Sequence, residues 1–314
     1  YITYDLLGLL KTTAAAQSVH FFIEDSTKII FLLFLVTGTI SFFRTYLNAE
    51  KVREYLENKP KWLGYLLAAI LGAITPFCSC SSIPLFVGFM GAGIPLGITF
   101  AFLIASPLIN ESSLYFFPAM FGLKVTILYN FFGLAIAVLG GMLIQRLRLE
   151  KYVIPELLKF KSRAQIETEN GGKQKTVKQL VVYFWKDGMS ITRQIFPYVA
   201  LGVGVGAIIH GFVPTSLVEH YLSAKSWWTV PIAVLLGAPL YANSVSVIPI
   251  MEAMVGKGAP LGTVLAFMTA IVTLSIPEAL ILKKVMRWQL LAIFFGITII
   301  GIVIMGYLFN VILK

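Results

Sequence analysis

The sequence has few charged residues and almost no cysteine. Of its 314 residues only 13% are charged, against about 25% in an average soluble domain, and 58% are hydrophobic. That composition excludes a disordered chain and argues against a soluble enzyme. The two cysteines, Cys78 and Cys80, are one residue apart, and a disulfide between positions i and i+2 would be strained. We therefore expect an all-α polytopic membrane protein whose fold does not depend on disulfides.

Acidic residues are scarce too, so the chain carries a formal net charge of +10. Lysine and arginine in cytoplasmic loops account for such an excess in a membrane protein, and no nucleic-acid partner is needed to explain it. No cleavable signal peptide is visible. Residues 1–27 are too polar for a span, and they predict an interfacial amphipathic helix on the lipid bilayer.

A membrane-spanning helix needs about 20 predominantly apolar residues. Six stretches meet this length, namely 28–47, 97–118, 123–145, 189–211, 262–282 and 288–312. Two more apolar stretches, 62–90 and 227–255, are interrupted by prolines and hydroxyl residues and predict broken, re-entrant helical hairpins. The helix breaks and hinges are expected at Pro76, Pro84, Pro107, Pro239, Pro249 and Pro277.

The chain repeats itself. Aligning 71–102 with 236–267 without gaps gives 14 identities in 32 positions, which indicates a duplication. We call this ungapped alignment, which pairs Leu71 with Leu236, the repeat register. With a further two-residue adjustment, Glu111 aligns with Glu278. The predicted organisation is an interfacial helix (1–27), a first transmembrane repeat (28–145), a basic linker (146–187) and a second transmembrane repeat (188–314).

Loop charge decides how the repeats are oriented. If 62–90 and 227–255 return to the side they enter from, the cytoplasmic loops 48–61, 146–186 and 283–287 hold 4, 10 and 3 Lys/Arg. If both stretches cross, seven of these basic residues move outside. The first arrangement gives each repeat about three transmembrane helices plus one hairpin, so the repeats have inverted topology. Such repeats with broken helices are typical of secondary transporters.

Unpaired backbone and polar side chains at the hairpin tips predict a binding site for a small molecule. Cysteine thiolates prefer soft, thiophilic ions, and the first tip contains a Cys-Ser-Cys sequence between two prolines. The second repeat has asparagine at the matching position, so any thiol site is one-sided. The candidate substrate-binding residues are Cys78, Ser79, Cys80, Ser81, Asn110, Asn243, Ser244 and Ser246.

The two stretches that carry these residues, TPFCSCSSIPLFVGFMGAGIPLGITFAFLIASPLINESS and GAPLYANSVSVIPIMEAMVGKGAPLGT, resemble the ArsP/YraQ-type predicted permeases of bacteria and archaea. The resemblance covers nearly the whole chain. It implies a multi-pass protein of the cell (inner) membrane that exports a trivalent organoarsenical or a similar thiol-reactive solute. It also implies that Cys78 and Cys80 face the arsenic.

Two carboxylates interrupt apolar spans. An acid inside a membrane is costly and suggests a function, so Glu111 and Glu278 are candidates for proton coupling. The alternative is that each caps or braces a helix broken by a proline.

The leading interpretation is an alternating-access carrier that exports a small thiophilic or thiol-bearing solute. A second is a transmembrane thiol-disulfide oxidoreductase, although such a protein needs a cysteine in each half. A third is a scaffold or assembly subunit without a transport site. We predict no enzymatic activity, no cofactor and no metal site. The sequence leaves the oligomeric state open, with a homo-oligomer among the options.

Overall fold

The computed structural model describes residues 61–75, 79–91, 93–110, 112–154, 227–240, 244–256 and 258–313, with isolated helical positions between 19 and 35 and between 185 and 204. At 79–81 and 244–246 it describes the backbone only. The predicted interfacial helix, the spans 28–47 and 189–211, and most of the linker lie outside these ranges. The described part is helical, which confirms the all-α prediction there.

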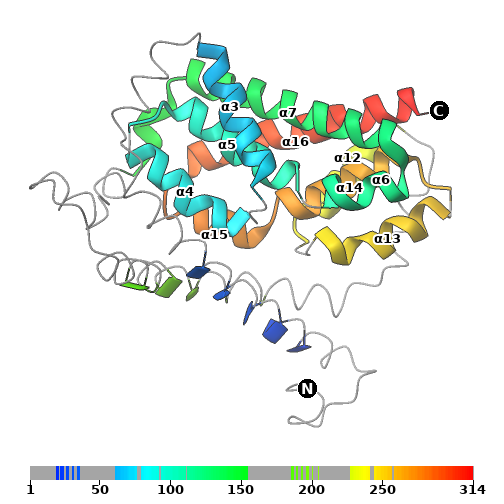
Figure 1. Ribbon diagram of the computed structural model, residues 1–314, viewed down its shortest axis with the longest axis horizontal. Helices are drawn as coiled ribbons and strands as arrows, with labels where there is room; N and C mark the ends of the chain where they lie inside the picture. The colour runs from blue at the N-terminus through cyan, green and yellow to red at the C-terminus, as the bar shows by residue number, and fades with distance from the viewer. Residues whose placement is uncertain are drawn as a thin grey trace, which may run out of the picture.

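The described helices form two series (Figure 1). The first comprises α3 (Lys61–Ile74), α4 (Ser79–Gly91), α5 (Leu96–Leu108), the π-helix η2 (Ser112–Phe116), α6 (Phe117–Met120), α7 (Gly122–Arg146) and the 3₁₀-helix η3 (Leu149–Tyr152). The second comprises α12 (Thr229–Gly237), α13 (Ser244–Gly256), α14 (Leu261–Thr273), α15 (Ile276–Leu282) and α16 (Trp288–Ile312). We call residues 61–146 the first half and 227–312 the second half.

The ends of α4 and α13 have the same geometry. Gly93 and Gly258, which the repeat register pairs, have φ values of 78° and 83°, a conformation that favours glycine. After α4, the amide of Ile94 donates to the carbonyl of Phe89 over 3.1 Å, and after α13 the amide of Ala259 donates to Met254 over 3.0 Å. These are the hydrogen bonds of a Schellman motif. The duplication read from the sequence is therefore repeated in backbone geometry.

Glycines bring the helices of each half into close contact. A Cβ at Gly72 of α3 would lie 2.6 Å from the carbonyl oxygen of Phe102 in α5, and one at Gly237 would lie 2.9 Å from that of Phe267. Gly97 meets the carbonyl of Gly141 in α7, and Gly262 meets that of Gly306 in α16. Every one of these contacts recurs between positions that the repeat register pairs, so both halves use the same three-helix packing.

The residue pairs that are in contact along these helices show in which direction each helix runs. Tyr65, near the start of α3, packs on Gly97 at the start of α5, and Gly72 packs on Phe102, so α3 and α5 are parallel. In α4, Ser82 contacts Ser106 and Phe86 contacts Phe100, so α4 runs back along α5. The chain therefore leaves along α3, returns along α4 and leaves again along α5.

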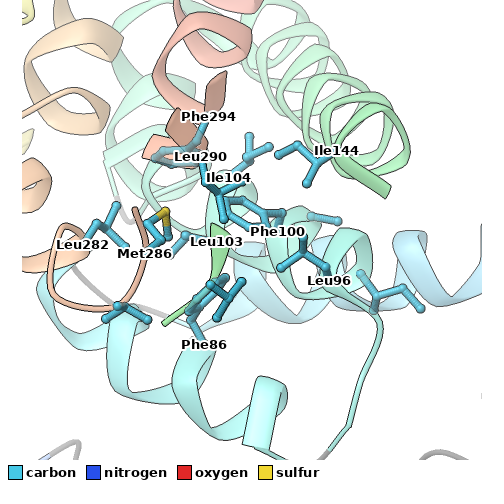
Figure 2. Close-up of a cluster of buried hydrophobic side chains, with 14 of the residues drawn as sticks. Phe86, Leu96, Phe100, Leu103, Ile104, Ile144, Leu282, Met286, Leu290 and Phe294 are labelled. Carbon is cyan, nitrogen blue, oxygen red and sulfur yellow. The ribbon is translucent and has the colours of Figure 1, made fainter. Parts of the chain in front are cut away.

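The two halves meet along their long helices. A Cβ at Gly301 of α16 would lie 2.6 Å from Ile136 of α7, and one at Gly140 of α7 would lie 3.1 Å from Ile297. Residue numbers rise on α7 as they fall on α16, so these matching helices are antiparallel, as Figure 1 also shows. One buried cluster joins both halves: Phe86 and Phe100 lie with Met286 and Phe294 (Figure 2).

A short pairing joins the segment after α7 to the segment before α16. The amide of Arg287 donates to Tyr152 over 2.8 Å, and that of Ile154 donates to Val285 over 3.1 Å. We call this pairing, residues 152–154 with 285–287, the strap. The exposed basic residues Arg146, Arg148, Lys151, Lys283 and Arg287 lie in or beside it.

Two described helices, α7 and α16, are long and apolar enough to cross a membrane. A third span results if α5 and Ser113–Met120, bent by 56°, are taken together. The predicted stretches 97–118 and 262–282 are each broken, after Leu108 and after Thr273.

The prolines correct part of the prediction. Pro107 lies next to the end of α5, and Pro239 follows α12, as expected of helix breaks. Pro84 and Pro249, in contrast, lie inside α4 and α13, which continue through them. Each proline is the sixth residue of its helix, so the helix loses one hydrogen bond, the one to the carbonyl of its second residue. Pro277 is in the first turn of α15, where proline favours helix initiation. Pro76 lies outside the described residues.

Candidate functional site

The cysteine motif stands at the beginning of α4. Cys78 lies outside the described residues, while Ser79, Cys80 and Ser81 form the backbone of the first turn. One residue later, the hydroxyl oxygens of Ser82 and Ser106 are 2.6 Å apart and buried. This hydrogen bond fixes the first turn of α4 beside the last turn of α5.

The first helix break lies directly after that turn and is held by amide and hydroxyl groups. The side-chain oxygen of buried Asn110 accepts from the amide of Ser113 over 3.0 Å. The Ser113 hydroxyl lies within hydrogen-bond distance of two acceptors, the carbonyl oxygen of Asn110 at 2.8 Å and the side-chain oxygen of Asn130 at 3.0 Å. Asn130 donates in turn to Thr126 over 2.9 Å. Predicted Asn110 therefore lies in a buried polar cluster that directly follows α5.

The second break is built in the same way. Ser275, which the repeat register pairs with Asn110, accepts a hydrogen bond of 3.3 Å from the amide of Glu278 and so caps α15. In the same register Glu278 corresponds to Ser113. The two-residue adjustment had paired it with Glu111, which lies outside the described residues.

Glu278 is fully buried, and its helix α15 packs against α4. Ile281 and Leu282 of α15 share a buried cluster with Ile83 and Phe86 of α4. The acid of the second half thus sits on a helix that touches the helix carrying the cysteine motif. Of the predicted residues in the second half, Ser244 begins α13 and Ser246 lies in its first turn, and the side chains of both are outside the described part. Asn243 lies outside the described residues.

The halves differ where α4 and α13 meet their neighbours. Val247 and Ile271 occupy the positions that correspond to Ser82 and Ser106, and both belong to one buried apolar cluster. The half with the cysteines therefore has a hydroxyl pair, and the half without them has two aliphatic side chains. The halves therefore differ in chemistry at Ser82 and Ser106, as well as in sequence at positions 78 and 243.

Sequence reasoning missed Tyr129, Asn130 and Thr269. The Tyr129 hydroxyl donates to the carbonyl of Leu108, the last residue of α5, over 3.1 Å, and lies 2.8 Å from the hydroxyl of Thr269 in α14. Tyr129 and Asn130 are adjacent polar residues within the apolar stretch 123–145, and this was the sequence signal that could have identified them. In the described part of the chain, no three His, Cys, Asp or Glu side chains lie close enough to hold a metal ion.

Taken together, two helix breaks, two helix starts and buried hydroxyl and amide groups occur in the interior of a helical membrane protein. Backbone that leaves the helical pattern at such depth is tolerated where it is buried in protein or lines a solute pathway.

Comparison with known proteins finds relatives of this chain. UPF0718 protein MJ0584 of Methanocaldococcus jannaschii is 22% identical over 335 residues, which cover 90% of this chain and 91% of that protein. UPF0718 protein YcgR of Bacillus subtilis is 29% identical over 104 residues, which cover 33% of this chain and 34% of that protein. No solved structure matches the chain.

One family model, ArsP_1, described as "Predicted permease", matches residues 14–311. That match covers nearly the whole chain and confirms the resemblance noted in the sequence. It supports a membrane transporter. The chain therefore belongs to the ArsP_1 family of predicted permeases.

Proposed function

We propose that the chain is a secondary transporter with inverted-topology repeats that works by alternating access and has no enzymatic activity. The observation that carries this proposal is the antiparallel course of the matching helices α7 and α16, each packed on its own half through the same glycine contacts. Two halves with the same structure and opposite orientation in the membrane can pack against each other in two symmetry-related conformations. That equivalence is what alternating access requires.

In this proposal α3–α4 and α12–α13 are re-entrant hairpins in the inner membrane, and the strap faces the cytoplasm. Support comes from exposed aromatic residues at both ends. Trp62 and Trp288 lie at the basic end, and Trp227, which the repeat register pairs with Trp62, accepts a 2.6 Å hydrogen bond from Tyr307 near the other end of α16. Trp288 and Tyr307 are separated by about 29 Å along the helix, close to the roughly 30 Å of a hydrocarbon core.

The proposed substrate is a small thiophilic solute, such as a trivalent organoarsenical, which the protein exports. In this proposal Cys78 and Cys80 supply soft ligands, and the Ser82–Ser106 hydrogen bond holds the start of α4 against α5. The apolar counterparts in the second half give no such chemistry, so the site is asymmetric. The proposal also includes proton coupling through Glu278, together with Glu111. Burying an ionisable side chain in a membrane protein is energetically costly, which suggests that Glu278 is retained for a function.

Transport into everted vesicles tests the substrate. We expect the double variant Cys78→Ser, Cys80→Ser to lose most uptake of a trivalent organoarsenical, because serine keeps the size of cysteine but not its softness. Its melting temperature should stay near that of the wild type, which serves as the folding control. Unchanged uptake would exclude a thiol site. Redox cycling of the two thiols by an added quinone, without uptake, would favour the oxidoreductase instead.

An imposed pH gradient tests the coupling. We expect Glu278→Gln to abolish gradient-driven accumulation while exchange of solute down its gradient continues, since the amide keeps the shape of the side chain but cannot release a proton. Glu111→Gln is the matched variant in the other half. Full accumulation in both variants would remove proton coupling through these acids.

A further inference from the structure

The two helix breaks have the same backbone geometry. The residue after α5, Ile109, has φ −110° and ψ 93°, and the residue after α14, Leu274, has φ −120° and ψ 69°. Their amides donate over 2.8 Å to an alanine four residues earlier, Ala105 in the first break and Ala270 in the second. The repeat register pairs these residues, so the breaks can be compared position by position.

At the first break, polar side chains serve the carbonyl groups at the end of α5. The last four carbonyls of a helix have no amide within the helix to accept from. The Tyr129 hydroxyl donates to the carbonyl of Leu108 over 3.1 Å, and the Asn110 side-chain amide donates to that of Pro107 over 3.4 Å. The last two carbonyls of α5 therefore have hydrogen-bond donors.

At the second break, the corresponding donors are replaced. Phe294 stands in the position of Tyr129 and has no hydroxyl. Ser275 stands in the position of Asn110, lacks the amide group, and uses its oxygen as the acceptor that caps α15. Within the described ranges, no hydrogen bond reaches the carbonyls of the last two residues of α14.

The last residue of α14, Thr273, adds a third oxygen without a partner. Its side chain is fully buried, and its hydroxyl has no hydrogen-bond partner in the part of the chain that the structure describes. The register pairs it with Leu108, so the first break has an apolar side chain there. A buried polar group of this kind calls for an explanation, and a bound ion or water is a common one.

We infer that the carboxyl end of α14 binds a monovalent cation such as sodium through the Thr273 hydroxyl and the carbonyl oxygens of Val272 and Thr273. The carboxyl end of a helix carries partial negative charge, which favours a cation over an anion. Oxygen ligands suit hard cations, and neutral ligands favour a single positive charge. Broken helices bind such ions in secondary transporters.

This cation site goes beyond the proposed function, and ion binding does not depend on alternating access. Glu278 remains the proposed proton site and is not assigned as a ligand. The sequence predicted no metal site, since backbone ligands leave no residue pattern to find.

Binding of radiolabelled sodium to the purified protein in detergent tests the site. We expect saturable binding that unlabelled sodium displaces and choline does not. Thr273→Val keeps the shape of the side chain and removes the hydroxyl. It should weaken binding about tenfold or more, since even the loss of a group behind a metal ligand costs about 10–100-fold in affinity. Thr273→Ser keeps the hydroxyl and should bind sodium like the wild type.

Thr298→Val is the matched control. Thr298 is also fully buried in the second half, but its hydroxyl donates to the carbonyl of Phe294 over 2.9 Å. This variant should bind sodium like the wild type and melt at a lower temperature, because it loses an existing hydrogen bond.

Thermal unfolding gives a second measurement. In choline chloride Thr273→Val should melt at or above the wild-type temperature, because it removes a buried hydroxyl without a partner. Sodium chloride at the same ionic strength should raise the melting temperature of the wild type and not that of Thr273→Val. No saturable binding to the wild type, or equal binding to Thr273→Val, would overturn the cation site, indicate a buried water instead, and leave the proposed transport untouched.

Discussion

Single glycines set how closely the helices of this transporter approach. Gly97 and Gly262 each face a carbonyl group of the long helix in their own half, with no room for a methyl group. Gly296 lies in the same kind of apolar helix but has no heavy atom within 4 Å of the position a Cβ would take. The same substitution therefore has opposite consequences at these positions.

We expect Gly97→Ala to destabilise the protein by about 1–3 kcal/mol, since the added methyl group forces α5 and α7 apart. Gly296→Ala should be neutral or slightly stabilising, because alanine is the better helix former. Thermal unfolding in detergent measures both. Equal melting temperatures for the two variants would contradict the close packing of α5 on α7.

At the scale of the element, the short helix α15 depends on its cap. Ser275 is extended, with φ −103° and ψ 149°, and its hydroxyl accepts the amide of Glu278. Because α15 packs against α4, loss of structure at the start of α15 would weaken its contacts with the helix that carries Cys80. The cap therefore connects the second break to the cysteine motif.

Ser275→Ala should cost about 1 kcal/mol and accelerate amide hydrogen exchange in α15, whereas Ser275→Asn, which retains a capping oxygen, should exchange like the wild type. Hydrogen–deuterium exchange with peptide resolution measures the difference. Slow exchange in the alanine variant would mean that packing on α4 alone holds α15.

The sequence predicted these elements unevenly. The repeat was visible because identical residues, such as Gly93 and Gly258, fulfil identical backbone requirements. The helix ends were harder, since Pro84 and Pro249 suggest breaks although α4 and α13 continue through them. Tyr129 was missed because its role depends on Leu108 and Thr269, which are distant in sequence and come together only through packing of the halves.

At the scale of the whole molecule, most of the basic residues discussed above lie at one end of the helices. The basic residues of the strap and of the end of α7 lie at the end where α3 begins, and Lys124 lies at the opposite end of α7. The topology with hairpins, which we propose, requires the start of α3 and the end of α7 to lie on one face. In the alternative, the start of α3 and the end of α7 would be on opposite faces.

Single cysteines in a Cys78→Ser, Cys80→Ser background test this arrangement. We expect Lys151→Cys and Lys283→Cys to react with an impermeant maleimide from the same face of the membrane, and Lys124→Cys from the other face. Intact and everted vesicles provide the two faces. Labelling of positions 124 and 151 from one face would contradict the proposed membrane orientation.

The strap also constrains how the protein is made. Its two segments, 152–154 and 285–287, are about 130 residues apart, which corresponds to roughly 7–26 s of translation at about 5–20 residues per second. During that interval the segment after α7 has no partner, so the first half must remain in the membrane without it. Pairing requires that residues 285–287 have been made and have left the ribosome. The strap is therefore a late event of biogenesis, and the order of synthesis separates insertion of the first half from its final attachment to the second.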